Sequence, residues 1–171
     1  MKRPSKVEYY LNIAKAVCKR STCLLRRYGA VIVKDDTIVS TGYNGPARGV
    51  VNCNEVGDCL KEMMGAERGR GYEHCPAVHA EENAIINAAR HGSSVLGGIM
   101  YACGEDVKTG KHLPIIPCYW CRRVIINAGI SKVYTMDENG NIIEYDPKQW
   151  IKEDSEDYIK RVEEAKKTRR P

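Results

Sequence analysis

Two periods of hydrophobic residues divide the chain into helices and strands. Apolar residues recur at helical spacing after Ser5, again in residues 80–89 and again in residues 118–128. Short apolar runs lie between or after these segments, at residues 29–33, 37–41, 99–102, 132–135 and 141–145. Because helices alternate with strands around one sheet, the pattern predicts a three-layer α/β/α sandwich with a central mixed sheet of about five strands.

Capping and turn residues set the predicted boundaries. Ser5 is suited to be the N-cap of the first helix, which we expect to end near Arg20 or Ser21. The polar residues 34–36 predict a hairpin between the first two strands. Pro147 begins a terminal helix that is acidic in its early turns and basic at its end, as the helix dipole favours.

Residues 47–76 show neither period and contain five glycines. So long a stretch without its own core is unusual inside a compact domain, unless something else ties it down. A second, structural zinc ion with four ligands would do so, although several candidate ligands could instead be ordinary buried thiols. The candidate ligands are Cys23, Cys53, Cys59, His74 and Cys75.

The composition fits a single domain that spans residues 1–171. No stretch approaches the length of a membrane span and the N-terminus has no apolar signal region, so we expect a cytoplasmic protein with no membrane partner. The net charge of +5 comes largely from a basic tail that starts at about residue 166. The charge therefore says little about an active site, and nucleic acid is not an expected partner.

Eight cysteines are present, and their grouping near histidines indicates reduced, metal-binding thiols more than a disulfide framework. Cys18 and Cys103 stand apart from the other six. Both lie in apolar surroundings, and we expect them to be buried and to pack as small hydrophobic residues.

Two short motifs carry the candidate chemistry: His79-Ala80-Glu81 and Pro117-Cys118-Tyr119-Trp120-Cys121. One histidine and two thiolates supply three zinc ligands and leave a fourth tetrahedral position open for water, as in catalytic zinc sites. Glu81 is placed to reach that water without binding the metal. Both motifs open predicted helices, where exposed N–H groups favour anionic thiolates and hydroxide.

Neither motif is specific by itself. A Cys-x-x-Cys pair is also typical of redox sites and of half a structural zinc knuckle, and a lone His-x-Glu often occurs by chance. Together, in this order and with Pro117 before the first cysteine, they match the signature of zinc nucleobase deaminases. The alternative is a structural zinc site in which Glu81 is an ordinary solvated helix residue.

On these motifs the chain resembles the cytidine deaminase superfamily and, within it, the deoxycytidylate (dCMP) deaminases. The Gly-Tyr-Asn-Gly turn matters most, because the related tRNA adenosine deaminases share the zinc motifs but not this turn. The likeness covers about residues 20–133 and implies a cytidine deaminase-like fold that hydrolyses dCMP to dUMP and ammonia. Its further segments are Arg20-Ser21-Thr22-Cys23, Gly29-Ala30, Gly42-Tyr43-Asn44-Gly45, Asn83-Ala84-Ile85 and Asn127-Ala128-Gly129-Ile130.

The resemblance implies a role for each residue of the zinc motifs. Zinc on His79, Cys118 and Cys121 would activate water for attack on C4 of the pyrimidine. Glu81 would take a proton from that water, pass it to N3 and then to the leaving amine. One carboxylate that acts first as base and then as acid needs a sheltered site and a pKa raised toward neutrality.

Substrate contacts are implied as well. Asn44 would hold the sugar hydroxyl, the backbone N–H of Ala80 the base carbonyl, and a cation such as Arg26 or Arg27 the 5′-phosphate. The competing interpretations are a plain turn asparagine and a solvated pair of surface arginines.

One position departs from the family. Related enzymes often line the base pocket with a tyrosine shortly after the strand that corresponds to residues 132–135, and this chain has none there. Either Tyr119 or Tyr134 substitutes for it, or the nucleotide preference differs.

The resemblance also implies regulation and assembly. It places an effector site at Tyr43, Gly45 and Arg90, where dCTP with Mg²⁺ activates and dTTP inhibits, although Arg90 could simply cap the C-terminus of its helix. For the second zinc, the family parallel is strongest at Cys23 and Cys53. A homo-oligomer, a hexamer by resemblance, is expected.

Two competing functions remain. One is deamination of another nucleotide, such as dCTP or CMP, or of an RNA base with the basic tail as a phosphate-binding arm. The other is a non-catalytic zinc module that binds nucleic acid, which would leave Glu81 and the open zinc position without a purpose.

Overall fold

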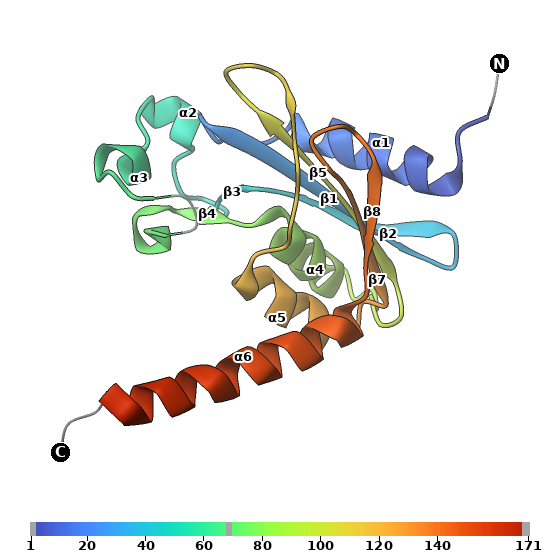
Figure 1. Ribbon diagram of the computed structural model, residues 1–171. Coiled ribbons are helices and arrows are strands. Elements are labelled where there is room, and N and C mark those ends of the chain that lie inside the picture. Colours follow the sequence, from blue (N-terminus) through green and yellow to red (C-terminus); the bar gives the residue numbers. More distant parts are fainter. Residues whose placement is uncertain (1–2, 68–69, 169–171) are drawn as a thin grey trace.

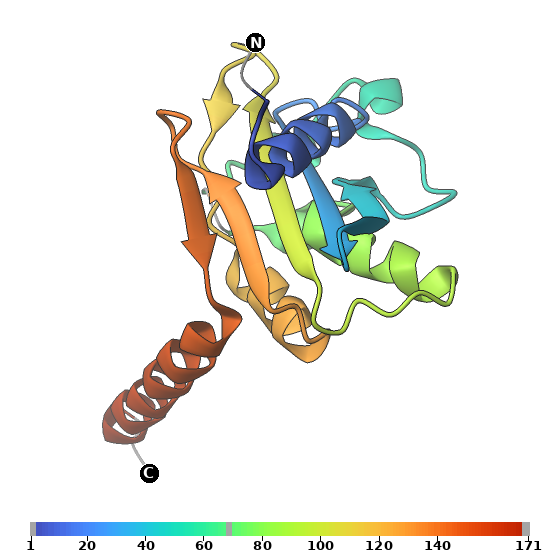
Figure 2. The same cartoon turned by 90° about the vertical axis from the view of Figure 1, so that its right-hand side faces the viewer.

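A mixed β-sheet forms the centre of the computed structural model, which describes residues 3–67 and 70–168 (Figures 1 and 2). The strands are β1 (Arg26–Lys34), β2 (Thr37–Tyr43), β5 (Ile99–Asp106), β6 (His112–Leu113), β7 (Lys132–Met136) and β8 (Ile142–Tyr145). Their order is β2-β1-β5-β7-β8, and β6 pairs with the far end of β5. The predicted mixed sheet of about five strands is confirmed.

Strand direction explains how the helices form two outer layers. β1 runs antiparallel to both β2 and β5, whereas β5 and β7 are parallel. A parallel pair needs a crossover connection, and this one contains α5 (Tyr119–Asn127). α5 and α4 (Ala80–Arg90) pack on one face of the sheet, and α1 (Lys6–Cys18) packs on the other (Figure 2). The three-layer α/β/α prediction is therefore confirmed.

Alternation along β1 divides the core between the two faces. Ala30 and Ile32 belong to the cluster under α4 and α5, whereas Val31 and Val33 belong to the cluster under α1. Because successive side chains of a strand point to opposite faces, a run that is buried on both sides is apolar throughout. This explains why residues 29–33 show no polar alternation.

The local signals at the N-terminal half act as predicted. Ser5 caps α1, and its hydroxyl accepts a hydrogen bond from the Glu8 N–H at 3.2 Å while the Glu8 carboxylate accepts one from the Ser5 N–H. The β1–β2 hairpin turns through Asp35 and Asp36, whose φ angles are +49° and +59°. Short polar side chains tolerate this left-handed region. α1 ends at Cys18, slightly before the predicted boundary.

Two strands extend three or more residues beyond one end of their apolar runs. β1 begins at Arg26 and β5 extends to Asp106, and in this added stretch Arg27 lies opposite Glu105. The extension is polar because it lies at the end of the sheet, where an ion pair and not an apolar contact joins the strands. Hydrophobic periodicity alone therefore missed it.

The aperiodic segment contains only short elements within its described residues. These are α2 (Cys53–Val56), α3 (Leu60–Met63) and the 3-10 helix η1 (Tyr72–His74). The segment is flanked by β3 (Gly45–Pro46) and β4 (Ala77–Val78), which pair with each other. α2 and α3 lie outside the sheet layers, beside the start of β1 (Figure 1). The expected absence of a long periodic element here is confirmed for the part that the structure describes.

The terminal helix α6 (Pro147–Thr168) is anchored only near its start, and its remainder extends away from the sheet (Figure 1). Trp150 is buried there, beneath the guanidinium of Arg122 at 5.1 Å from the ring centroid. Residues 166–168 of the predicted basic tail form the end of this helix, and residues 169–171 lie outside the described part of the chain. No described helix is both long and apolar enough to cross a membrane.

Cys18 and Cys103 are buried, as predicted from their apolar surroundings. Burial raises the pKa of Cys18 to about 11 and that of Cys103 to about 12. The Cys103 thiol donates a hydrogen bond to the Leu11 carbonyl at 3.2 Å. Both residues therefore act as core side chains and not as reactive thiols.

Glycines allow two helices to approach the sheet closely. A Cβ atom on Gly42 of β2 would lie 2.2 Å from the Ala84 nitrogen and 2.4 Å from the Ala80 carbonyl oxygen of α4. A Cβ atom on Gly29 of β1 would lie 2.4 Å from the Ala14 oxygen of α1. Since these are backbone atoms, only a shift of the helix could relieve either clash.

We predict that Gly42→Ala and Gly29→Ala each lower the free energy of unfolding by about 1–3 kcal/mol or more, as overpacking does. Only Gly42→Ala should also weaken zinc binding, because it displaces the helix that follows His79. Denaturant titration and zinc competition with a chelator measure the two effects. Equal zinc affinity in the two variants would contradict this account of how α4 is placed.

Candidate active site

Two helix N-termini meet at the candidate metal site. His79 is the N-cap of α4 and Cys118 is the N-cap of α5, while Cys121 lies in the first turn of α5. Residues 114–117 lead into α5. Their position is fixed because the Thr135 hydroxyl donates a hydrogen bond to the Ile115 carbonyl at 3.1 Å. The free N–H groups of both first turns favour negative charge at this point.

The three predicted ligands come together with donor atoms suited to zinc. His79 Nδ1 lies 3.2 Å from Cys121 Sγ and 3.4 Å from Cys118 Sγ, and all three donor atoms lie within 4.8 Å of one another. Zinc bonds of about 2.1 Å to nitrogen and 2.3 Å to sulfur give tetrahedral edges of about 3.6 Å. The donor set therefore fits a zinc ion that keeps one coordination position for solvent.

The two thiols are electrostatically coupled. A hydrogen bond from the Cys121 thiol is the largest cause that lowers the pKa of Cys118 to about 4, and His79 adds to it. The same hydrogen bond, together with burial, raises the pKa of Cys121. The hydrogen bond to Cys118 also raises the pKa of His79. Because zinc binds thiolates, metal binding here is expected to release the proton of Cys121.

Glu81 is a buried carboxyl group beside these ligands. It lies in the first turn of α4, and 8% of its surface is exposed. Burial raises its pKa, since removal from water disfavours the charged form. A carboxyl group with a raised pKa binds a proton more readily than an exposed one, which suits a group that must first take up a proton and then return it.

A cavity of about 500 Å³ opens onto His79, Ala80, Glu81 and Cys118. Ala80 is the first residue of α4, so its backbone N–H has no partner within the helix and remains available to a ligand. The cavity therefore joins the donor set, the buried acid and a free backbone donor in one space large enough for a small ligand.

Asn44 also lines the cavity, with its side chain held by the sheet. Its Oδ1 accepts a hydrogen bond from the Tyr28 N–H at 2.7 Å, and its Nδ2 donates one to the Arg26 carbonyl at 3.0 Å. Ser21 adds a hydrogen bond to the Asn44 carbonyl at 2.8 Å. An amide nitrogen carries two hydrogens, so Asn44 keeps one for a ligand.

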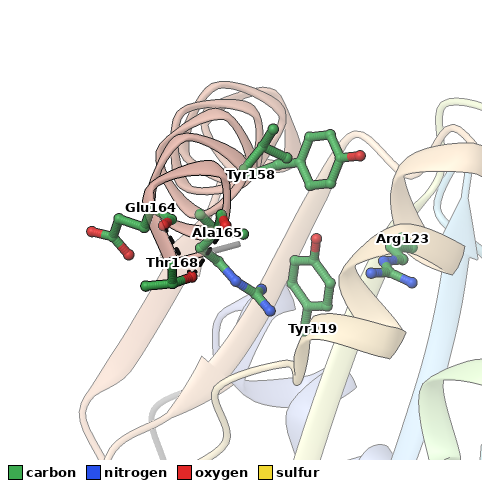
Figure 3. A pocket seen from close by; sticks show the side chains of 8 residues that line it. Tyr119, Arg123, Tyr158, Glu164, Ala165 and Thr168 are labelled. Carbon is green, nitrogen blue, oxygen red and sulfur yellow. Dashed lines mark hydrogen bonds between the residues drawn. The ribbon is translucent and has the colours of Figure 1, made fainter. Parts of the chain in front are cut away.

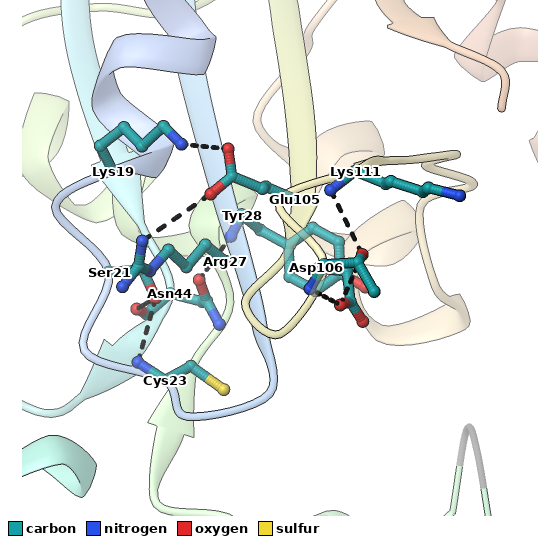
Figure 4. A network of polar contacts seen from close by, with 10 residues as sticks. Lys19, Ser21, Cys23, Arg27, Tyr28, Asn44, Glu105, Asp106 and Lys111 are labelled. Carbon is teal, nitrogen blue, oxygen red and sulfur yellow. Dashed lines mark hydrogen bonds and ion pairs between the residues drawn. The ribbon is translucent and has the colours of Figure 1, made fainter. Parts of the chain in front are cut away.

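The two candidate arginines point in different directions. Arg26 lines the cavity, whereas Arg27 lies 3.7 Å from the carboxylate of Glu105, which also pairs with Lys19 (Figure 4). Glu105 is 6% exposed, so it depends on these cations for its charge. Arg27 supports the end of the sheet, and Arg26 is the arginine that faces the candidate site.

Neither proposed tyrosine lines this cavity. Tyr134 lies on the α1 face of the sheet, where its ring stacks on Tyr101 and its hydroxyl donates to Glu144 at 2.5 Å. Tyr119 lies beside Arg123 in a separate hollow between α5 and α6 (Figure 3). Two other tyrosines, Tyr28 and Tyr72, line the cavity instead.

Sequence reasoning missed part of this lining because it comes from the aperiodic segment. Tyr72 lies with its ring centroid 5.4 Å from that of His79, and Lys61 lies over the Tyr72 ring. Ile115 and Ile116 supply apolar lining from the link before α5. The sequence does place Tyr72 seven residues before His79. This spacing alone does not predict that the two rings lie next to each other.

Four of the five candidate ligands for a second metal gather at the edge of the same cavity. Burial and the nearby thiols of Cys23, Cys75 and Cys59 raise the pKa of Cys53. Cys23, Cys59 and Cys75 also line the cavity. His74 instead has its Nε2 atom 3.8 Å from the Glu73 carboxylate. Among the described residues, His79, Cys118 and Cys121 form the only group of three or more candidate ligands whose donor atoms all lie within 4.8 Å of one another.

The three candidate effector residues lie in two places. Tyr43 and Gly45 flank the turn after β2, and Arg90 is the exposed last residue of α4. The Asn83 amide of α4 donates a hydrogen bond to the Tyr43 carbonyl at 2.8 Å. The turn and the helix are therefore linked directly.

Comparison with known proteins gives a consistent family. The profile of the "Cytidine and deoxycytidylate deaminase zinc-binding region" matches residues 4–137. A deoxycytidylate deaminase of Mycobacterium phage D29 is 36% identical over 138 residues, which cover 78% of this chain and 95% of that protein. The deoxycytidylate deaminase of Schizosaccharomyces pombe is 35% identical over 144 residues, or 80% of this chain. The match spans 40% of the length of that relative.

A solved structure agrees. The dCMP deaminase of cyanophage S-TIM5, in complex with dCMP and dUMP, superposes with a TM-score of 0.58 and 25% identity, covering 80% of this chain and 85% of that one. Its fold, the matched profile and the His79, Cys118 and Cys121 site lead to the same assignment. The chain belongs to the cytidine and deoxycytidylate deaminase zinc-binding family.

Proposed function

We propose that the protein is a zinc-dependent enzyme that hydrolyses dCMP to dUMP and ammonia. The observation that carries the proposal is the buried Glu81 carboxyl group, which shares a cavity with the His79, Cys118 and Cys121 donors. The relatives named deoxycytidylate deaminase, and the related structure that holds dCMP and dUMP, favour this substrate over other pyrimidines.

The roles of the residues follow from their positions. Bound zinc lowers the pKa of water and supplies a nucleophile at neutral pH. Glu81 would accept a proton from that water and deliver it to N3 of the base. It would then take the proton of the new hydroxyl on C4 and pass it to the departing amine, so that C4 becomes a carbonyl as its bond to nitrogen breaks. The Ala80 N–H holds the base carbonyl, Asn44 donates its remaining amide hydrogen to the sugar hydroxyl, and Arg26 attracts the 5′-phosphate.

Ammonia release from dCMP, dCTP, CMP and tRNA separates this proposal from its alternatives. The highest kcat/KM should be for dCMP. Preference for dCTP, CMP or tRNA would replace the proposed substrate, and no ammonia from any of the four would favour a non-catalytic zinc module.

A second zinc ion is proposed at Cys23, Cys53, Cys59 and Cys75. Four cysteines form a common structural zinc site, and their proximity across an otherwise coreless segment supports one here. Zinc thiolate sites need reduced cysteines, which fits the proposed cytoplasmic location.

Regulation by dCTP with Mg²⁺ as activator and dTTP as inhibitor is also proposed. α4 connects the exposed Arg90 to the catalytic first turn, and it contacts β2 through Asn83 and through the Asn87 amide, which donates to the Thr41 carbonyl at 2.7 Å. A triphosphate that binds near the turn after β2 could bias the position of this helix if two packings exist.

Assembly into a homo-oligomer, a hexamer by family resemblance, completes the proposal. The exposed apolar residues Ile151, Tyr158 and Ile159 of α6 support a contact with another copy. The proposed catalytic unit is the single domain that contains both helices of the zinc site.

We predict that Glu81→Gln keeps its catalytic zinc but lowers kcat on the order of 10³-fold, because the amide cannot transfer the proton. His79→Ala should lose the catalytic zinc and the activity together. Elemental analysis with an ammonia assay distinguishes the two variants. Substantial turnover by Glu81→Gln would remove the role assigned to Glu81.

We predict two zinc ions per chain in metal-replete protein and one in Cys53→Ala, because a three-cysteine remnant binds zinc more weakly. Cys18→Ala is the matched control and should retain two. Elemental analysis after gel filtration gives the counts. One zinc ion per chain in the unmodified protein would rule out the second site.

We predict sigmoidal dCMP kinetics that become hyperbolic with dCTP and Mg²⁺, and inhibition by dTTP. Arg90→Glu should lose both responses but keep turnover at saturating dCMP, whereas Lys152→Glu, on the exposed face of α6, should respond normally. Initial rates with each effector provide the test. Kinetics of the unmodified protein that neither effector changes would end the proposal of regulation.

A further inference from the structure

One wall of the cavity is built by described residues between Cys59 and Cys75, in the ranges 59–67 and 70–75. Cys59 is the N-cap of α3, and Lys61 follows two residues later. Lys61, Tyr72 and both cysteines line the cavity. This wall contains none of the residues assigned above to the catalytic zinc, the base or the sugar, so its side chains have no role yet in the reaction.

Lys61 is held over the cavity by an aromatic ring. Its ammonium lies 4.5 Å from the Tyr72 ring centroid, and the Tyr72 ring lies 5.4 Å from that of His79. Lys61 is half-buried. A cation over an aromatic face is attracted by the ring, which limits the conformations of an otherwise flexible side chain. The ammonium is therefore placed one ring away from the metal-binding histidine.

Arg26 faces the same cavity from the start of β1. Its carbonyl accepts the hydrogen bond from Asn44, so this cation lies next to the residue proposed to hold the sugar. Within residues 3–67 and 70–168, neither Arg26 nor Lys61 has a carboxylate at ion-pair distance. Two cations from different segments thus line one cavity with their charges uncompensated by an ion pair.

The other charged residues of this wall that line the cavity are acidic and more exposed. Glu62 and Glu67 line the cavity, and the Glu67 carboxylate lies 3.7 Å from Arg70. The carboxylates of Glu62 and Glu67 repel an anionic ligand. A cation close to such a ligand is needed to offset this repulsion. Lys61 is the cation that the wall itself supplies.

We propose that Lys61 binds the 5′-phosphate of a nucleoside monophosphate together with Arg26. The inference rests on the proposed function and adds the residue that makes the enzyme prefer a monophosphate to the corresponding nucleoside. An ammonium and a guanidinium on two sides of a phosphate form charge-assisted hydrogen bonds, which are stronger than neutral ones. The segment that the four cysteines fix thereby becomes part of the substrate site.

The test compares Lys61→Met with Lys61→Arg and with Lys152→Met, a control on the exposed face of α6. For Lys61→Met, KM for dCMP should rise about tenfold or more, the size expected for one lost charge-assisted contact. Its kcat should remain within about threefold. Lys61→Arg should restore most of the affinity, and Lys152→Met should match the unmodified enzyme.

Inhibition by dUMP and by deoxyuridine supplies a second readout that does not need turnover of a nucleoside. Lys61→Met should raise the inhibition constant of dUMP about tenfold and leave that of deoxyuridine within about twofold, because only dUMP carries a phosphate. Equal weakening of both ligands, or a KM for dCMP within twofold of normal, would overturn the role of Lys61. An unmodified protein that releases no ammonia from dCMP would instead refute the proposed function itself.

Discussion

The close contact between β2 and α4 is the constraint on which the site depends. Gly42 lets the backbone of α4 approach the strand, and side chains then seal the contact: the Ser40 hydroxyl donates to the Ala84 carbonyl at 2.7 Å, and Asn83 and Asn87 donate to carbonyls of β2. These contacts together fix the position of the first turn of α4. His79 and Glu81 lie at the start of α4, so the sheet determines the positions of the candidate metal ligand and of the proposed proton carrier.

The second half of the site comes from the parallel pair β5–β7. Its crossover brings the N-terminus of α5 to the end of α4 that holds His79, and the hydrogen bond from Thr135 to the Ile115 carbonyl fixes the link before Cys118. Two helix N-termini thereby meet at one cluster of two thiols, an imidazole and a carboxyl group. Burial raises the pKa of Glu81 within this cluster, so the same packing that assembles the ligands prepares the acid and base.

The cluster of His79, Cys118 and Cys121 could be predicted from the sequence, because each motif consists of residue types that bind zinc and also begins a helix that hydrophobic periodicity reveals. The arginine that faces the cavity could not be chosen between Arg26 and Arg27, because the strand was expected to begin only at Gly29 and its alternation was not extended to them. Tyr134 was proposed for the pocket for the same reason, because the alternation of side chains along its strand was not used. It lies on the opposite face of β7 from Val133.

The wall formed by Lys61 and Tyr72 could not be predicted from the sequence for another reason. Its residues are brought together by tertiary packing and by the proximity of four thiols, and neither leaves a period in the sequence. The aperiodic stretch indicated that something must fix this segment. It did not indicate that the fixed segment would complete the cavity.

The central claim is that His79, Cys118 and Cys121 hold zinc with a position left for solvent beside Glu81. X-ray absorption at the zinc edge tests it most directly, on protein with Cys53→Ala and Cys59→Ala so that only this site is loaded. The account predicts two sulfur neighbours at about 2.3 Å and two nitrogen or oxygen neighbours at about 2.0–2.1 Å. Four sulfur neighbours, or no bound zinc, would contradict it.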